Sequence, residues 1–400
     1  MSEMSYLEKL LDGVEVEWLP LGHIAAIKTG QSVNKNMISK NPGVYPVINS
    51  GREPLGFINT WNTDNDPIGI TTRGAGVGSV IWQEGKYFRG NLNYSITIDK
   101  KNHINIRYMY HALLHMKNDI HELCTFDGIP ALNAGSLKKL LIPIPCPDNP
   151  EKSLAIQSEI VRILDKFTAL TAELTAELNM RKKQYNYYRD QLLSFDEGEV
   201  EWKALGEIGE VRMCKRILKS QTSSEGEIPF YKIGTFGKEP DSYISRKLFN
   251  EFKEKYSYPK VGEVLISASG TIGRTVIFDG RESYFQDSNI VWIENNEKIV
   301  LNKYLFYFYK IAKWGISEGG TIKRLYNDNL RKLMIPVPFP DSPERSLVEQ
   351  QKIVKLLDKF DALTNSITEG LPREIELRQK QYEYYRDLLF SFPKPDTVSN

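Results

Sequence analysis

Residues 143–170 read PIPCPDNPEKSLAIQSEIVRILDKFTAL, and residues 336–363 read PVPFPDSPERSLVEQQKIVKLLDKFDAL. By direct count, the two stretches are identical at 17 of 28 positions. A second pair follows them, QYNYYRDQLLSF from Gln184 and QYEYYRDLLFSF from Gln381. The motif VEW-xx-LG also occurs twice, from Val16 and from Val200. A repeat of this length indicates that one duplicated frame organises the chain.

Apolar residues recur three or four positions apart from Leu154 to Phe195, and the second copy repeats them at the same phase. This period predicts two long helices whose apolar stripes bury each other as an antiparallel coiled coil. The first helix contains TAEL twice, over residues 171–178, while the second copy is one such unit longer. We expect the spacer to have changed by whole turns, with a break or kink near Gly370 and Pro372.

Between the shared blocks lie two regions with little mutual similarity. Both contain strand-like runs separated by glycine turns and then an aromatic helical stretch, so we interpret them as α/β modules. They align loosely through GAGVGSVIW from Gly74 and GTIGRTVIF from Gly270. A common strand framework with different loops is typical of recognition modules.

The fold class that we predict is mixed, α+β: two α/β modules separated by two long antiparallel helices, in a circular arrangement with approximate two-fold symmetry. The circle requires the segment SYLEKLL, from Ser5 to Leu11, to form a short helix beside the end of the second long helix. The predicted segments are a short N-terminal helix (1–16), module 1 (17–147), helical spacer 1 (148–196), module 2 (197–340), helical spacer 2 (341–392) and a flexible tail (393–400).

Composition excludes several classes of protein. The 400 residues carry a net charge of only +1, so no uniformly basic coat is present. Three cysteines without a C-x-x-C pair fit a reducing compartment and argue against a structural zinc site. His111 and His115 have a spacing that metals use, but no carboxylate stands at a telling position, so we predict no metal site. With neither a signal-like N-terminus nor a long apolar run, we expect a cytoplasmic protein.

Candidate DNA contacts are polar, basic or aromatic residues near glycine turns. Arginine can bind guanine through two hydrogen bonds, Asn or Gln can do so with adenine, and turn amides can meet phosphate. Surface or turn structure is the alternative role for each of them. The loop GGTIKRLYND, from Gly319 to Asp328, is the strongest candidate. The full set is Thr72, Arg73, Arg89, Asn91, Asn93, Lys215, Arg216, Ser267, Ser269, Thr271, Arg274, Gln286, Asn289, Lys323, Arg324 and Tyr326.

The chain resembles the specificity subunits of type I restriction-modification systems over nearly its whole length. The resemblance rests on the paired IPxPxPD-x-PE-x-SL frame, EIVRILDKFTALTAEL and QYNYYRDQLLSF, and the tandem TAEL is similar to the type IC branch. It implies two target recognition domains, each reading one half of a bipartite, asymmetric DNA target. It also implies helices that set the spacer and dock two methyltransferase subunits, which two restriction subunits join.

In such systems the recognition chain itself has no catalytic site and no cofactor. S-adenosylmethionine, ATP and Mg²⁺ are then expected on the partner subunits. Charged residues repeated on the two helices would suit duplicate partners, although a solvated helix face explains them equally. These docking candidates are Asp165, Lys166, Arg189, Asp190, Asp358, Lys359, Arg386 and Asp387.

Two other readings stay open at this point. A stand-alone DNA methyltransferase is suggested by GAGVGS, from Gly74 to Ser79, after a strand-like run and with Asp99 further on. The residues after these glycines favour a strand, whereas a cofactor fingerprint needs a helix there. The second reading is a protein-only scaffold in which the modules are structural. Sequence-selective DNA retention by the complex would exclude it.

Overall fold

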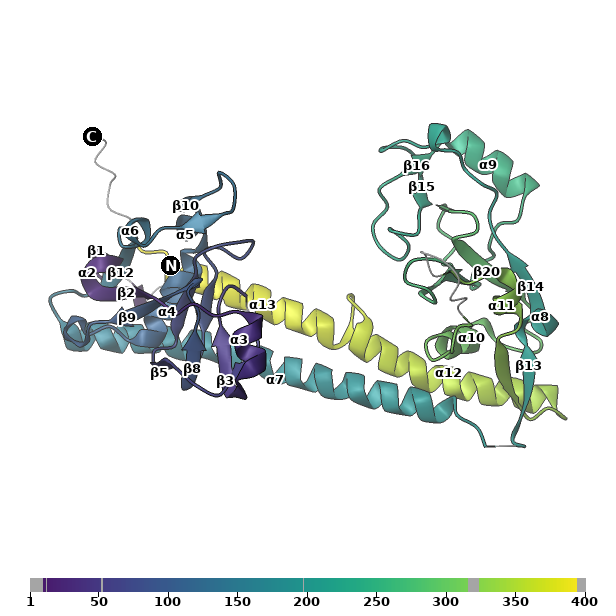
Figure 1. Ribbon diagram of the computed structural model, residues 1–400, viewed down its shortest axis with the longest axis horizontal. Coiled ribbons are helices and arrows are strands. Elements are labelled where there is room, and N and C mark those ends of the chain that lie inside the picture. The colour runs from purple at the N-terminus through teal and green to yellow at the C-terminus, as the bar shows by residue number, and fades with distance from the viewer. Residues whose placement is uncertain (1–9, 12, 52, 197, 316–323, 394–400) are drawn as a thin grey trace, which may run out of the picture. The chain divides into compact units, whose positions relative to one another are not determined.

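The computed structural model describes residues 10–11, 13–51, 53–196, 198–315 and 324–393. The chain divides into two compact units (Figure 1). Unit 1 comprises residues 1–175 and 374–400, and unit 2 comprises residues 176–373. Each unit therefore contains one module and parts of both long helical segments.

Unit 1 is built mainly from short strands with small helices between them. Its strands are β1 Val16–Pro20, β2 Ala25–Thr29, β3 Pro42–Ile48, β4 Phe57–Ile58, β5 Thr63–Asp64, β6 Ile68–Thr71, β7 Val80–Trp82, β8 Lys86–Arg89, β9 Asn93–Ile98, β10 Cys124–Thr125, β11 Ala131–Leu132 and β12 Leu141–Pro145. Its short helices are α2 Leu21–Ile24, α3 Lys35–Lys40, η1 Lys100–Asn102, α4 Ile106–His115, α5 Lys117–Glu122 and α6 Ala134–Leu137.

Unit 2 repeats this plan with fewer described strands. They are β13 Val200–Ala204, β14 Gly209–Arg212, β15 Ile228–Tyr231, β16 Tyr243–Ile244, β17 Val264–Ser267, β18 Thr275–Ile277, β19 Tyr284–Phe285, β20 Ile290–Asn295 and β21 Met334–Pro338. The short helices are α8 Leu205–Ile208, η2 Lys219–Gln221, α9 Arg246–Lys255, α10 Asn302–Tyr309 and α11 Asn327–Arg331. The long helices are α7 Pro150–Leu192, α12 Pro343–Asn365 and α13 Gly370–Leu389.

The two units share sheet topology as well as sequence frame. Each has a four-stranded antiparallel sheet, in the order β2-β9-β6-β7 in unit 1 and β14-β20-β17-β18 in unit 2. Each also has one parallel pair, β3 with β8 and β15 with β19. The repeated VEW and IPxP motifs pair as strands in the same register, with Trp18 opposite Pro143 and Trp202 opposite Pro336. The α/β interpretation of both modules is confirmed.

Helix α4 joins the sheet of unit 1 to the long helices, because it is apolar on two sides. It begins where the Asn105 side chain accepts hydrogen bonds from the backbone N–H groups of Arg107 and Tyr108, a common N-cap arrangement. Met109 and Leu113 pack in the core formed with the four-stranded sheet. Tyr108 and Ala112 pack instead in a cluster with α7 and α13. Helix α4 thus lies between the sheet and the helices (Figure 1).

The long helices bury their apolar stripes against each other, as the period predicts. In unit 1, Phe167 of α7 stacks on Tyr385 of α13 with ring centroids 5.2 Å apart. In unit 2, Tyr188 of α7 stacks on Phe360 of α12 at 5.5 Å. Since α7 meets α13 along its first part and α12 along its second, it meets its partners in reverse chain order, as antiparallel pairing requires.

The predicted break near Gly370 is confirmed, but the predicted extra helical turn is wrong. Helix α12 ends at Asn365 and α13 begins at Gly370, which leaves residues 366–369 outside both helices. The second copy exceeds the first by four residues, and four residues leave the helix here. Gly370 has φ +76°, and a Cβ atom on it would lie 2.4 Å from the Ala362 carbonyl oxygen. The additional tetrapeptide is therefore looped out and does not lengthen the helix.

The two ends of the described chain meet in unit 1. Ser5–Lys9 of the predicted N-terminal helix lie outside the described residues, but Leu10 and Leu11 are helical and pack against the cluster that contains Phe390 and Phe392. The Trp18 Nε1–H donates a hydrogen bond of 2.8 Å to the carbonyl oxygen of Pro393. The expected packing of the N-terminal helix beside the end of the second long helix is confirmed for Leu10 and Leu11.

Candidate nucleic-acid interface

Three loops of unit 1 lie side by side at one edge of the four-stranded sheet, and we call them loop cluster 1: residues 72–79, 90–92 and 126–131. Backbone hydrogen bonds connect them. Thr72 N–H donates to the Leu92 carbonyl at 3.0 Å, and Leu132 N–H donates to the Thr72 carbonyl at 2.8 Å. Gly74 N–H donates to the Pro130 carbonyl at 2.9 Å. The cluster therefore has a fixed backbone from which side chains of any chemistry can project.

Loop cluster 2 has the same construction in unit 2 and consists of residues 268–274, 286–289 and 324–325. Ala268 N–H donates to the Asn289 carbonyl at 2.8 Å, and Leu325 N–H donates to the Ala268 carbonyl at 2.8 Å. The isolated bridge between Ser269 and Arg324 corresponds to the one between Arg73 and Ala131 in unit 1. The two clusters thus share a backbone pattern and differ in their side chains.

The sequence candidates in unit 1 separate by exposure. Arg73 and Asn91 are exposed in loop cluster 1, so their side chains are available to a ligand. Thr72 is buried, and its backbone N–H and carbonyl make the hydrogen bonds to Leu92 and Leu132 that connect the loops.

Arg89 and Asn93 are inside the sheet, 3% and 0% exposed. The Arg89 guanidinium donates to the Tyr94, Asp66 and Ile68 carbonyls at 2.7–3.2 Å, as well as to the Asn93 side chain and the Tyr87 hydroxyl.

Burial explains both the electrostatics and the sequence around Arg89. Burial lowers the pKa of the Arg89 guanidinium, while interactions with Tyr87 and Asp66 act in the opposite direction. A Cβ atom on Gly69 would lie 2.8 Å from the guanidinium and 2.5 Å from the Asn93 side chain, so only glycine leaves room for this pair. Because a base contact would require Arg89 to leave all these partners, we assign Arg89 and Asn93 a structural role and remove them from the base-contact candidates.

Several of the unit 2 candidates make side-chain hydrogen bonds within loop cluster 2 or to its neighbours. Ser269 Oγ donates to Asn289 Oδ1 at 2.8 Å, and the Arg324 guanidinium donates to the Ser288 carbonyl at 3.0 Å. The Arg274 guanidinium donates to the Phe236 carbonyl at 2.9 Å. The buried Ser267 hydroxyl donates to the Thr271 carbonyl and accepts a hydrogen bond from the Arg274 N–H. These contacts make the residues supports of the loops.

The candidates of unit 2 that face solvent are fewer. Lys215, Arg216, Thr271 and Tyr326 are exposed. The half-buried Gln286 accepts a hydrogen bond of 2.9 Å from the Ile233 N–H, and Lys323 lies outside the described residues.

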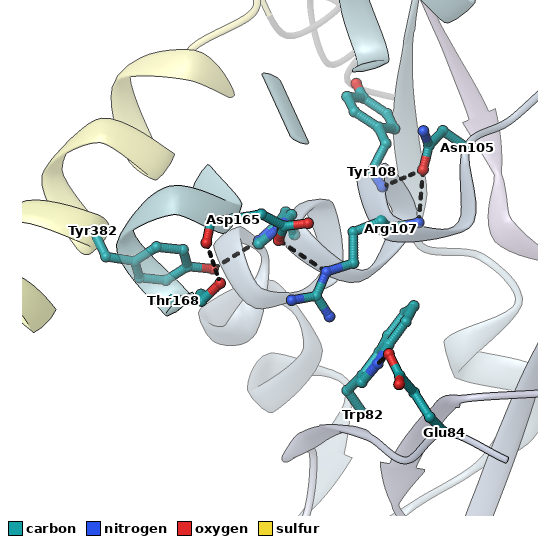
Figure 2. A network of polar contacts seen from close by, with 9 residues as sticks. Trp82, Glu84, Asn105, Arg107, Tyr108, Asp165, Thr168 and Tyr382 are labelled. Atoms are coloured by element: carbon teal, nitrogen blue, oxygen red, sulfur yellow. Dashed lines mark hydrogen bonds and ion pairs between the residues drawn. The ribbon is translucent and has the colours of Figure 1, made fainter. Parts of the chain in front are cut away.

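Both units fasten the module to the long helix through one aspartate. In unit 1, Asp165 of α7 accepts a hydrogen bond of 2.9 Å from Arg107 Nε (Figure 2). It also accepts one of 2.8 Å from His111 Nε2. The Arg107 guanidinium also lies over the Trp82 ring of β7, 4.4 Å from its centroid. A polar connection thus runs from the sheet through α4 to α7.

His111 extends this connection to α13. Its side chain is fully buried, and its Nδ1 lies 2.9 Å from the Tyr382 hydroxyl. Burial lowers the pKa of His111 to about 4, although Asp165 favours the charged form. The ring is therefore neutral near pH 7. Its Nε2–H donates to the Asp165 carboxylate, and its Nδ1 accepts from Tyr382.

Unit 2 makes the same connection with different residues. Asp358 of α12 accepts from the Tyr307 hydroxyl and from Lys303 Nζ, both at 2.7 Å. A further contact is common to both units. Gln157 accepts a hydrogen bond from the backbone N–H of Asn105 at the start of α4, and Gln350 accepts one from the backbone N–H of Leu301 at the start of α10. The helices of the frame therefore present the same anchoring points to unlike modules.

These anchors change the interpretation of the docking candidates. Asp165 and Asp358 hold the modules, so their carboxylates are already engaged within the chain. Arg189 with Asp190 and Arg386 with Asp387 are adjacent ion pairs at 2.8 Å, and Asp387 also binds His115 at 2.9 Å. Lys166 and Lys359 are exposed at equivalent positions. Lys166, Lys359 and the outer sides of the ion pairs remain candidates for a partner.

Sequence reasoning missed the anchoring role of Arg107, Tyr307 and the two glutamines. A usable signal was present in the duplicated frame: Ser153 and Gln157, like Ser346 and Gln350, are polar residues four positions apart on an otherwise apolar helix face. Buried polar residues of this kind need partners. In both copies the glutamine amide donates to the serine hydroxyl, at 3.0 and 3.1 Å.

Within the residues that the structure describes, no group of three or more His, Cys, Asp or Glu side chains could hold a metal ion. Among the same residues, no helix is both long enough and apolar enough to span a membrane.

Comparison with known proteins identifies one family. The profile of the type I restriction modification DNA specificity domain matches twice, over residues 13–181 and 197–377. A putative type I restriction enzyme specificity subunit of Haemophilus influenzae is 50% identical over 97% of this chain and 98% of its own length. The EcoR124I/EcoR124II specificity subunit of Escherichia coli is 44% identical over the full length of both chains.

Solved structures agree on the fold. The crystal structure of the S subunit of a type I restriction-modification system from M. genitalium matches with a TM-score of 0.59 at 19% identity, and the match covers 98% of this chain and all of that one. A chain from a structure of type I restriction-modification complex assembly matches with a TM-score of 0.52 at 14% identity, covering 94% and 97%.

Proposed function

This chain belongs to the type I restriction modification DNA specificity family, and we propose that each of its modules reads one half of a bipartite, asymmetric DNA target. The observation that carries the proposal is the pair of loop clusters. Both are connected by the same backbone hydrogen bonds, yet they expose different side chains: Arg73 and Asn91 in loop cluster 1, and Thr271 in loop cluster 2, with Tyr326 exposed directly after it. Because unlike side chains read unlike bases, the two half-sites differ and the whole target is not a palindrome.

The chain acts as the non-catalytic specificity subunit of a multisubunit DNA methyltransferase and endonuclease. We infer that its two copies of the helical frame dock two modification subunits, through the equivalent exposed surfaces around Lys166 and Lys359. Two restriction subunits complete the complex, and S-adenosylmethionine, ATP and Mg²⁺ bind to these partners. The complex acts in the cytoplasm, where the three buried free thiols of this chain fit a reducing environment.

The geometry disfavours a stand-alone methyltransferase. The glycines of residues 74–78 are followed by strand β7, Val80–Trp82, which pairs with β6. A cofactor-binding glycine turn places its ligand at the N-terminus of a following helix, and no helix opens at this point of the described chain. The glycines serve instead to form a tight turn next to loop cluster 1.

The proposal is tested with single substitutions in the assembled complex. We expect Arg73→Ala to relax base preference in one half-site and Thr271→Ala to relax it in the other. A lost bidentate arginine contact costs about 1–3 kcal/mol of discrimination, and the threonine contact less. Binding is measured on duplexes in which each base pair of both half-sites is changed in turn.

The matched control is Lys100→Ala, because Lys100 is exposed and lies beyond the other end of β9 from loop cluster 1. This variant should keep the preference of the native complex at every base pair. If Arg73→Ala and Thr271→Ala relaxed the same half-site, or changed no base preference, the assignment of one half-site to each module would be wrong.

A further inference from the structure

The hairpin β10–β11 of unit 1 carries two large apolar side chains at its tip. Phe126 is 51% exposed and Ile129 is 68% exposed. Two such residues within a five-residue tip are costly to leave in water, and clustered exposed apolar groups commonly mark a contact. The tip belongs to loop cluster 1, whose other exposed residues include Arg73.

The base of this hairpin is rigid. Cys124 is buried and pairs with Leu132, while the next pair is Thr125 with Ala131. Leu132 N–H binds the Thr72 carbonyl, and the Pro130 carbonyl accepts from Gly74 N–H, so the hairpin is fixed to the loop that follows β6. Phe126 leans on the ring of His121 in α5, with centroids 4.7 Å apart. Because the base of the hairpin is fixed, the side chains at its tip keep their position when a ligand binds.

The position of the hairpin tip favours duplex DNA as its ligand. The tip is hydrogen-bonded to the loop that carries Arg73, and the isolated bridge between Arg73 and Ala131 holds the Arg73 backbone beside the hairpin. The Arg73 side chain is exposed. A DNA phosphate satisfies the cation, while a base step that opens accepts an apolar side chain. Proteins that deform DNA combine these two features, a basic contact and an apolar wedge that partly unstacks neighbouring bases.

We propose that Phe126 and Ile129 form an apolar wedge that enters a base step at the first half-site and unstacks it. This inference rests on the proposed function and extends it to a second way of reading the first half-site. Module 1 reads its half-site partly through the ease with which one step opens, which adds sequence preference without hydrogen bonds to that step.

The experiment uses the complete complex and duplexes with 2-aminopurine placed in turn at each position of the first half-site. The native complex should raise the fluorescence at one step besides the base that the complex methylates. The double variant Phe126→Ala/Ile129→Ala should lose that signal, keep the signal at the methylated base, and bind at least tenfold more weakly. A mismatch at the same step should tighten binding by the native complex and have little effect on the variant.

Phe57→Ala is the matched control, since Phe57 is 53% exposed in the same unit on β4, outside loop cluster 1. It should behave as the native complex does. Unchanged fluorescence and affinity in the double variant would overturn the wedge, and so would failure of the variant to assemble with its partner subunits, because the tip would then be a protein contact. If the native complex showed no sequence-selective binding at all, the proposed function itself would fail.

Discussion

At the scale of single residues, the modules are attached to the frame by polar contacts whose chemistry differs between units and in which only the His111 and Tyr307 side chains are buried. Asp165 meets a histidine and an arginine, whereas Asp358 meets a tyrosine and a lysine. A carboxylate on a helix accepts any of these donors, so the frame can remain constant while the module changes. The cost of leaving such a buried donor unpaired keeps each pair matched.

His111 makes the stability of unit 1 depend on pH. Its folded-state pKa of about 4 lies below the value near 6.5 expected in the unfolded chain. Between these values the unfolded chain binds a proton that the folded chain does not. The stabilisation is therefore complete above pH 6.5 and is lost progressively as pH falls toward 4, by up to roughly 3 kcal/mol at 1.36 kcal/mol per pKa unit.

We expect His111→Tyr, which copies Tyr307 of unit 2, to remove this part of the pH dependence. Calorimetric melting of the native chain and the variant at pH 7.5 and pH 5.0 measures it, and all other titrating groups cancel in the comparison. The native chain should lose more thermal stability at pH 5.0 than the variant does. An equal loss in both would contradict the assignment of the titration to His111.

Sequence reasoning placed the candidate contacts near glycine turns, and the structure brings several of these turns together in the two loop clusters. It did not show which candidates are buried supports of the loops and which are exposed. Arg89 could not be separated from Arg73, because only the fold shows that Gly69 opens a space for one guanidinium inside the sheet while the other faces solvent. Side-chain direction depends on strand pairing across the module, which a single sequence with unlike modules does not reveal.

At the scale of elements, the spacer is built from helices that differ by a looped tetrapeptide. Periodicity predicted both long helices, since apolar residues that recur three or four positions apart lie on one face of an α-helix. Periodicity alone could not show that residues 366–369 leave the helix, because four added residues also preserve the phase of a continuous helix. The positive φ of Gly370 is incompatible with a continuous right-handed helix at this position, so the chain forms a loop here.

We predict that a third TAEL inserted after Leu178 lengthens the spacer of the DNA target and leaves both half-sites unchanged. Four residues add about 6 Å and about 400° to α7, which keeps its apolar stripe on nearly the same face. Given about 3.4 Å per base pair, the target should gain one or two pairs. Methylation mapping in cells that carry the altered system reads the spacer directly. Retention of the original spacer with undiminished preference would reject the prediction.

At the scale of the whole molecule, duplication accounts for the partners as well as the target. Each copy of the frame presents an exposed lysine and an arginine–aspartate pair at equivalent positions, so one surface occurs twice. We therefore expect two modification subunits for each copy of this chain. Native mass spectrometry of the modification complex should give a two-to-one ratio. A stable, fully active one-to-one complex would show that only one copy of the surface is used.

We infer that each module alone determines one half-site, while the frame determines how far apart the two are read. A module exchange separates these roles: residues 17–147 are replaced with the matching segment of a family member whose methylated sites have been mapped, and methylated sites are then mapped in cells that carry the chimeric system. We predict a target in which one half-site is new and the other half-site and the spacer are unchanged. A change in both half-sites, or in neither, would contradict it.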